Sequence, residues 1–441
     1  MSASSEIDLG KYLEKIERLS PVSVRGRVKE AVGLLVKATV PDVSVGEICL
    51  ISNPRSAHPV KAEVVGFQRG DVLLMPLGDI VSISPQSEVV PTGNCLTVVV
   101  GDQLLGRVLN GLGEPIDTKL KGPLDCREEY PANGRPPHPL YRKRVTQPLS
   151  VGVRAIDSLL TCGEGQRIGV FAAAGVGKSA LLGMIARHTE ADVNVIALIG
   201  ERGREVRDFL ERDLGPDGLQ RSVIICATSN EPSLVRLKGA YVATAVAEYF
   251  RDQGKKVILM MDSVTRFARA QREVGLASGE PPTRGGYTPS VFAELPKLLE
   301  RAGNSDQGSI TAFYTVLVAG DDMNEPVADE VRSILDGHII LSRELATQNH
   351  YPAIDVLESV SRVMDAVSDA GHRQAAHRMR EVLAVYQKQK DLILLGAYQP
   401  GADSRVDFAI SNIDKIQAFL RQAVDERTSA EETVARLKSM F

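Results

Sequence analysis

Small residues followed by a lysine and a serine form the most informative segment of the chain, Ala172–Ser179 (AAAGVGKS). A loop of small residues lets backbone N–H groups approach phosphate oxygens, and the N-terminus of a following helix adds positive partial charge. The pattern predicts a phosphate-binding loop in which Lys178 contacts the β- and γ-phosphates of ATP and the Ser179 hydroxyl binds Mg²⁺. The residues of this loop expected to contact the nucleotide are Ala174, Gly175, Val176, Gly177, Lys178, Ser179 and Ala180.

The loop departs from the general pattern at its first position, where Ala172 replaces a glycine. Alanine is acceptable there if the backbone keeps a negative φ. The alternative interpretation is a glycine-rich turn between a strand and a helix, with an exposed lysine. The order of strand, loop and apolar helix over Arg167–His188 favours phosphate binding.

Two carboxylates directly follow apolar runs that are typical of buried parallel strands. Asp262 ends the run Lys256–Met261 and is expected to hold Mg²⁺ through water. Glu201 follows Val193–Ile199 and is a candidate to orient and polarise the water that attacks the γ-phosphate. The alternative for Glu201 is a charged helix start, because residues 201–212 are dense with solvated ions.

Strands and helices alternate from Val151 to about Ser342, which predicts a parallel sheet with crossover helices to position these groups. Short β-rich runs from Val22 to about Val90 predict a small barrel or sandwich. Beyond Ala366 the pattern is helical, over Ala375–Gln389 and Ile413–Leu437. The fold class is therefore α/β with a β-rich N-terminal domain and a helical C-terminal domain. The predicted segments are an amphipathic arm (1–20), a β-rich barrel or sandwich (21–93), an α/β domain with the phosphate-binding loop (94–365) that includes a proline-rich irregular connector (114–148), and a helical domain (366–441).

Composition excludes several classes of protein. Lys and Arg number 52 against 56 Asp and Glu, a net charge of −4, which argues against a globally basic nucleic-acid binder. Apolar runs such as Val257–Met261 fall short of the roughly 18 residues that a membrane helix needs, and we expect no signal peptide. The 5 cysteines are scattered without a CxxC pair, which argues against a disulfide framework or a zinc site.

Taken together with the phosphate-binding loop, four further motifs resemble the type III secretion ATPases. They are Leu105–Pro115 (LGRVLNGLGEP), Gly152–Asp157 (GVRAID), Gly200–Glu205 (GERGRE) and His350–Val356 (HYPAIDV). That family includes the flagellar export ATPase and the virulence injectisome ATPase and is similar to the catalytic subunit of rotary ATP synthases. The resemblance implies a β-barrel, a RecA-like P-loop domain and a C-terminal helical domain, assembled as a homohexamer that hydrolyses ATP with Mg²⁺.

The resemblance also implies roles for individual residues. Glu201 matches the catalytic glutamate and Asp262 the Walker B aspartate, while Arg202 and Arg266 match positions near the γ-phosphate. Arg362 matches the arginine finger, which acts on the nucleotide of the neighbouring subunit.

For three of these assignments a plainer alternative remains open. Arg362 can also be read as a surface arginine paired with Asp365 or Glu358. Tyr351 and Tyr398 match aromatic positions that flank the adenine base, and the alternative is that both are ordinary core or rim residues.

The family further implies partners and a location. Hydrolysis would drive release of substrates from chaperones, their unfolding and their entry at the cytoplasmic face of an inner-membrane export apparatus, to which the enzyme binds peripherally. Expected partners are a central stalk protein, a stator or regulator protein, the export gate and chaperone–substrate complexes, with no nucleic acid. The amphipathic stretch Leu9–Leu19 resembles the arm that engages the stator and neighbouring subunits.

Short segments of the sequence indicate the branch of the family to which the chain belongs. Ser82–Gly93, Ala328–His338 and Asp355–Met364 resemble injectisome members, whereas Val65–Asp79 and Gly320–Pro326 resemble flagellar ones. We favour the injectisome, with the flagellar export ATPase as the alternative. A rotary ATP synthase subunit, an RNA translocase and a non-catalytic nucleotide-binding subunit are the remaining rivals.

Overall fold

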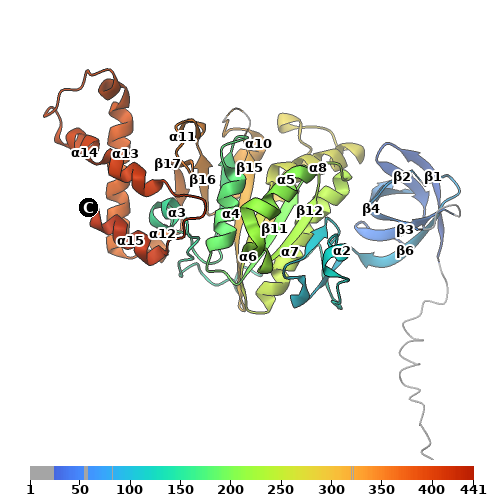
Figure 1. Cartoon of the computed structure of the whole chain (residues 1–441). Coiled ribbons are helices and arrows are strands. Elements are labelled where there is room, and N and C mark those ends of the chain that lie inside the picture. Colours follow the sequence, from blue (N-terminus) through green and yellow to red (C-terminus); the bar gives the residue numbers. More distant parts are fainter. Residues whose placement is uncertain (1–23, 54–57, 82, 319, 321) are drawn as a thin grey trace, which may run out of the picture. The chain divides into compact units, whose positions relative to one another are not determined.

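The computed structural model describes residues 24–53, 58–81, 83–318, 320 and 322–441 (Figure 1). The predicted N-terminal arm, including Leu9–Leu19, lies outside the described residues. The chain divides into two compact units between Leu96 and Thr97, and each is described by itself.

The first unit is a closed barrel of six antiparallel strands in the order β1-β2-β5-β4-β3-β6. Side chains alternate between the interior and the outside, so Val36, Ala38, Val64 and Leu74 fill the core. The predicted small barrel is therefore confirmed. The strands are β1 Gly26–Val32, β2 Leu35–Thr39, β3 Glu47–Ser52, β4 Val60–Gln68, β5 Asp71–Pro76 and β6 Glu88–Cys95.

A mainly parallel sheet forms the centre of the second unit, in the order β17-β16-β10-β15-β13-β11-β12-β8. Only β17 and the short β14 run antiparallel to their neighbours, so the predicted parallel sheet is confirmed. The strands are β8 Val108–Asn110, β10 Arg167–Ala172, β11 Val193–Ile199, β12 Ser222–Ala227, β13 Lys256–Asp262, β14 Gly303–Asn304, β15 Ser309–Leu317, β16 Gly337–Leu341 and β17 Ile354–Ser361.

Helices cover both faces of this sheet because the side chains of each strand alternate. Ile196 and Leu198 of β11 share a hydrophobic core with α4, whereas Ile199 points toward Gly239 of α7. The helices are α3 Arg154–Leu159, α4 Lys178–His188, α5 Gly203–Asp208, α6 Gly215–Gln220, α7 Ser233–Asp252, α8 Val264–Ala277, α9 Pro289–Leu299, α10 Pro326–Ile334, α11 Arg343–Thr347 and α12 Met364–Val367. In the described part of the chain, no helix combines the length and the apolarity needed to cross a membrane.

The proline-rich connector is more ordered than the sequence predicts. It carries a short helix, α2 Thr118–Lys121, and a strand, β9 Glu128–Pro131, that pairs with β7 Thr97–Val100. The rest of residues 114–148 is irregular apart from turns and isolated bridges.

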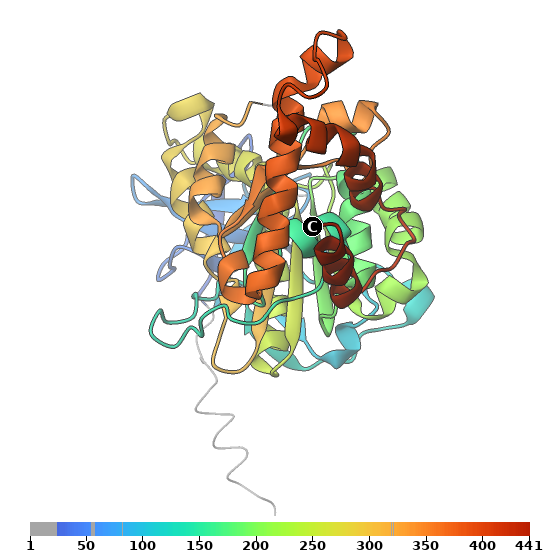
Figure 2. The same ribbon diagram turned by 90° about the vertical axis from the view of Figure 1, so that its left-hand side faces the viewer.

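Three helices complete the chain: α13 Ala370–Leu394, α14 Ser404–Leu420 and α15 Ala430–Ser439. Figure 2 looks onto this region, drawn in orange to dark red. The helical pattern expected over Ile413–Leu437 is interrupted, because residues 421–429 leave the helical path. Ser429 then caps a new helix by accepting a hydrogen bond from the Glu432 N–H.

Arg154 explains why the chain breaks there. This residue at the start of α3 is only 3% exposed, and its N–H donates to Gln422 Oε1 at 2.8 Å. Its guanidinium donates to the Phe419 carbonyl at 2.8 Å, to the Arg421 carbonyl and to the Glu426 carboxylate. The last turn of α14 and the segment after it therefore supply the acceptors for a buried cation. The helical region also shares a core with the sheet.

Candidate functional site

The phosphate-binding loop joins β10 to α4, as predicted. Gly175 and Gly177 have φ of 83° and 92°, in the left-handed region that favours glycine. Ala172 is not among the described non-glycine residues with positive φ. Alanine at the first position of the loop therefore costs no backbone strain.

Three sequence-predicted side chains meet beside this loop. Lys178 Nζ lies 2.5 Å from Asp262 Oδ1 and 4.0 Å from Glu201 Oε1. Asp262 ends β13 and Glu201 follows β11, and these two strands are neighbours in the sheet. The carboxyl ends of adjacent parallel strands thus deliver both carboxylates to the loop.

Thr315 is a member of the site that sequence reasoning missed. Its hydroxyl donates to Asp262 Oδ1 at 2.8 Å, or to the Met261 carbonyl at 3.2 Å. The register of β13 and β15 pairs Met261 with Tyr314, which places Thr315 beside Asp262. No local motif marks Thr315, because its role arises only from the pairing of two strands far apart in the sequence.

Glu201 is 9% exposed, and its environment disfavours the ionised form of its carboxyl group. Burial foremost, then a hydrogen bond with Glu205 and the charge of Asp262, raise the pKa of Glu201 to about 7. Lys178 and Arg266 act in the opposite direction. A carboxylate with a pKa near the working pH is suited to accept a proton from water.

The two candidate arginines lie in different surroundings. Arg266 donates to the Gly200 carbonyl at 2.6 Å, and its Nη2 is 3.8 Å from Glu201 Oε2. The Arg202 side chain is 78% exposed just before α5, and among the residues that the structure describes its ionic partner is Glu205 at 3.6 Å. Arg266, rather than Arg202, is therefore the arginine in contact with the buried carboxylate.

The donor set beside the loop fits Mg²⁺. Ser179, Glu201, Glu205 and Asp262 line one small cavity of about 50 Å³. Within the described ranges, no three or more His, Cys, Asp or Glu side chains cluster as a metal cage would require. Mg²⁺ in nucleotide enzymes needs no such cage, since it binds one or two protein oxygens together with phosphates and water.

The two tyrosines expected at the adenine base are placed differently. A Cβ added to Gly177 would lie 3.3 Å from Tyr351 Cε1, so the half-exposed Tyr351 ring packs against the phosphate-binding loop. The Tyr398 phenol oxygen lies 3.0 Å from both the Asp403 carbonyl oxygen and Asp407 Oδ1, to either of which it can donate, at the start of α14. The structure thus brings Tyr351 to the loop and anchors Tyr398 within the helical hairpin.

Arg362 follows β17 and is exposed. Its guanidinium forms no hydrogen bond or ion pair within the described residues, so it pairs with neither Asp365 nor Glu358. Its N–H donates to the Asp336 carbonyl at 3.0 Å, beside the start of β10. The 6 residues of β10 span about 20 Å, so Arg362 and the phosphate-binding loop lie at opposite ends of one strand.

Known protein families match most of the chain. The nucleotide-binding domain of the ATP synthase alpha/beta family matches residues 152–361, its β-barrel domain matches 28–93, and the T3SS EscN ATPase C-terminal domain matches 368–439. The flagellum-specific ATP synthase of Bacillus subtilis is 54% identical over 97% of this chain and 98% of its own length. The type 3 secretion system ATPase of Xanthomonas euvesicatoria is 54% identical over 94% of this chain and 93% of its own. The chain belongs to the type III secretion and flagellar ATPases.

A solved member of the family has the same fold as this ATPase. The assembled ATPase EscN from the enteropathogenic E. coli type III secretion system matches with a TM-score of 0.89 at 48% identity, covering 94% of this chain and 99% of that one. EscN in complex with its central stalk EscO matches with a TM-score of 0.87. The predicted barrel, RecA-like domain and C-terminal helical region are confirmed, whereas the exact boundaries stay a prediction.

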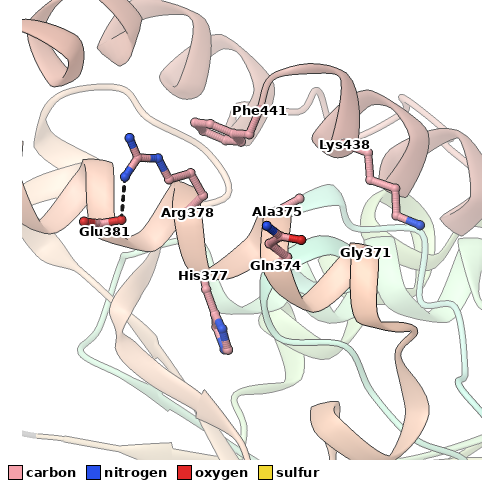
Figure 3. A pocket seen from close by; sticks show the side chains of 8 residues that line it. All are labelled: Gly371, Gln374, Ala375, His377, Arg378, Glu381, Lys438 and Phe441. Carbon is pink, nitrogen blue, oxygen red and sulfur yellow. Dashed lines mark hydrogen bonds and ion pairs between the residues drawn. The ribbon is translucent and has the colours of Figure 1, made fainter. Parts of the chain in front are cut away.

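A second, larger cavity in this ATPase lies away from these residues. It measures about 720 Å³ and lies between α13 and α15, where Arg378 and Glu381 form an ion pair at 2.7 Å (Figure 3). None of the sequence-predicted site residues lines it. The larger of the two cavities therefore does not coincide with the predicted nucleotide-binding residues of this enzyme.

Proposed function

We propose that this ATPase works as a Mg²⁺-dependent homohexamer that energises type III protein export. The observation that carries the proposal is the meeting of Lys178, Glu201 and Asp262 at the phosphate-binding loop. In this arrangement the loop and Lys178 hold the triphosphate, and Glu201 takes a proton from the attacking water. Ser179 and Asp262 hold Mg²⁺, which neutralises charge on the phosphate oxygens when bound.

The position of Arg362 supports a site shared between subunits. An arginine about a strand length from its own phosphate-binding loop is too far away to serve that loop. Its guanidinium, unpaired within the described residues, is available to a neighbour's nucleotide, where an arginine finger is typically worth about 10³–10⁵ in rate. Arg202, Tyr351 and Tyr398 are the further proposed contacts, with the two tyrosines at the adenine base.

We assign the export function to the injectisome branch on the segments Ser82–Gly93, Ala328–His338 and Asp355–Met364. Relatives named for the flagellum and for type 3 secretion are equally identical to this chain, so the flagellar branch is the alternative. The proposed partners are a central stalk, a stator or regulator, the export gate and chaperone–substrate complexes. The proposed location is peripheral, at the cytoplasmic face of the inner-membrane export apparatus.

The decisive experiment separates nucleotide binding from turnover. We expect Glu201→Gln to bind MgATP as tightly as wild type while losing hydrolysis, because the amide cannot accept the proton. The matched control is Glu211→Gln, because the Glu211 side chain is exposed and pairs with Arg207. This variant should keep both nucleotide binding and hydrolysis. Normal hydrolysis by Glu201→Gln would overturn the assignment of the base.

The shared site has its own test. Specific ATPase activity should rise with protein concentration as rings assemble, and activity that does not change with concentration in a strict monomer would refute it. For the branch, the gene is expressed in strains lacking either the injectisome or the flagellar ATPase. Restored effector secretion supports our assignment, whereas restored motility alone supports the alternative.

A further inference from the structure

Gln166 is a buried residue beside the end of β17, the strand that Arg362 follows. It immediately precedes β10 and is 0% exposed. Its own N–H donates to the Gly163 carbonyl at 3.0 Å, and its carbonyl accepts from the Ala312 N–H at 2.9 Å. The backbone of Gln166 is thus fixed before its side chain makes any contact.

The side-chain amide of Gln166 joins three separate segments. Its Oε1 accepts from the Gly163 N–H at 2.9 Å. Its Nε2 donates to the Asp336 carbonyl at 3.1 Å and to Ser361 Oγ at 3.2 Å. A buried amide with partners on both ends holds its neighbours in register, since a buried hydrogen-bonding group left unpaired destabilises the fold.

These contacts converge on the backbone of Arg362. The Asp336 carbonyl that accepts from Gln166 also accepts from the Arg362 N–H at 3.0 Å. Ser361, the residue before Arg362, donates its hydroxyl to the Thr161 carbonyl at 2.9 Å. Two consecutive residues, Ser361 and Arg362, are therefore tied to one buried amide, directly or through a shared acceptor.

Gly337 makes room for this arrangement. A Cβ at this position would lie 2.6 Å from the Val360 carbonyl oxygen and 3.1 Å from Gln166 Nε2. The close packing of β16, β17 and the Gln166 amide thus depends on the absence of a side chain at residue 337.

We propose that Gln166 is a positioning residue for the arginine finger. It fixes the backbone at Ser361 and Arg362, so that the Arg362 side chain extends from a fixed Cα position toward the neighbouring subunit's nucleotide. This role rests on the proposed action of Arg362 across the subunit interface. A fixed Cα position matters because a long arginine side chain has many rotamers, and a misplacement of about 1 Å can lower the rate about 10²-fold.

The perturbation is Gln166→Met, which keeps the length of the side chain and removes the amide. We expect single-turnover hydrolysis, with ATP well below the subunit concentration, to slow by about tenfold or more. Affinity for a fluorescent ADP should stay within about twofold of wild type, since the phosphate-binding loop lies at the other end of β10. Ser361→Ala removes one Gln166 partner by a smaller change and carries the test if Gln166→Met does not fold.

Mixed rings separate a misplaced finger from a damaged pocket. Gln166→Met is co-assembled with Glu201→Gln, which has a sound finger but cannot hydrolyse ATP. In an equal random mixture, about a quarter of the sites combine a Gln166→Met pocket with a Glu201→Gln neighbour on the finger side. These sites should hydrolyse at the wild-type rate and appear as a fast phase absent from either variant alone.

A mixture of Arg362→Ala with Glu201→Gln is the reference for this assay. If that mixture shows the fast phase and the Gln166→Met mixture does not, Gln166 serves its own pocket and the positioning role is refuted, whereas the shared site stands. If neither mixture shows it, Arg362 does not act across the interface, and both proposals fail.

Discussion

The pKa of Glu201 gives a sharp prediction for the pH dependence of hydrolysis. The proposed base, Glu201, must be a carboxylate to act, and burial with the neighbouring acids Glu205 and Asp262 raises its pKa to about 7. Protonation therefore removes the base as the pH falls through this value. We expect kcat/KM to be about half its plateau at pH 7, about a tenth at pH 6, and to fall about tenfold per pH unit below.

The assay is phosphate release at MgATP well below KM, from about pH 5.5 to pH 8.5 at constant ionic strength, because kcat/KM reports the free enzyme. Circular dichroism over the same range confirms that the fold persists. An ordinary glutamate, with a pKa of about 4.3, would give a nearly flat profile.

Glu205→Gln identifies the titrating group. The Glu205 carboxylate raises the pKa of Glu201 through their hydrogen bond, so the neutral amide should move the midpoint to lower pH. Glu211→Gln, at an exposed position, should leave it in place. A flat wild-type profile, or one midpoint shared by wild type and Glu205→Gln, would refute the reasoning.

Three further predictions concern single contacts. Thr315→Val removes the hydroxyl that holds Asp262, so hydrolysis should fall about 10–100-fold and saturate at higher Mg²⁺, measured by Mg²⁺ titration of activity and of ADP binding. Tyr351→Ala removes the ring over the loop and, if it stacks on adenine, should weaken fluorescent ADP binding by about tenfold. Arg301→Met leaves Glu248 as an unpaired buried charge, since Arg301 Nη2 and Glu248 Oε2 lie 2.5 Å apart and the two side chains are 1% and 6% exposed. It should lower the free energy of unfolding by about 3–5 kcal/mol in urea titrations.

Conservative variants provide the controls for these contacts. Thr315→Ser keeps the hydroxyl and should restore the Mg²⁺ response, and Tyr351→Phe should bind nucleotide as wild type does. An unchanged Mg²⁺ response in Thr315→Val would contradict the role given to its hydroxyl. An unfolding free energy within about 1 kcal/mol of wild type for Arg301→Met would mean that Glu248 is neutralised or solvated in the variant.

The sequence predicts those parts of the site that are contiguous or end an apolar strand. The loop around Lys178 is one unbroken segment, and Asp262 and Glu201 mark the ends of recognisable strands. Parallel strands deliver their carboxyl ends to one edge, so their proximity follows from the fold class.

The missed residues depend on which strands are neighbours. Thr315 reaches Asp262 because β15 pairs with β13, and Gln166 reaches Ser361 because β16 separates β10 from β17 by a single strand. Neither neighbour relation leaves a local pattern in the chain. The interruption of the helical pattern expected over Ile413–Leu437 has a similar origin, since Arg421 and Glu426, after α14, accept hydrogen bonds from the guanidinium of Arg154, more than 250 positions earlier.

The acceptors around Arg154 also limit how members of this family recombine. A chimera that took its last three helices from another branch would have to bring a carbonyl, an amide and a carboxylate to the places now held by Phe419, Gln422 and Glu426. Without them, the buried Arg154 guanidinium would lose the Phe419 carbonyl and the Glu426 carboxylate, and the Arg154 N–H would lose its acceptor on Gln422. The helical region can therefore not be exchanged without regard to its sequence. A crossover point in such a chimera must preserve these hydrogen bonds in addition to lying at a domain boundary.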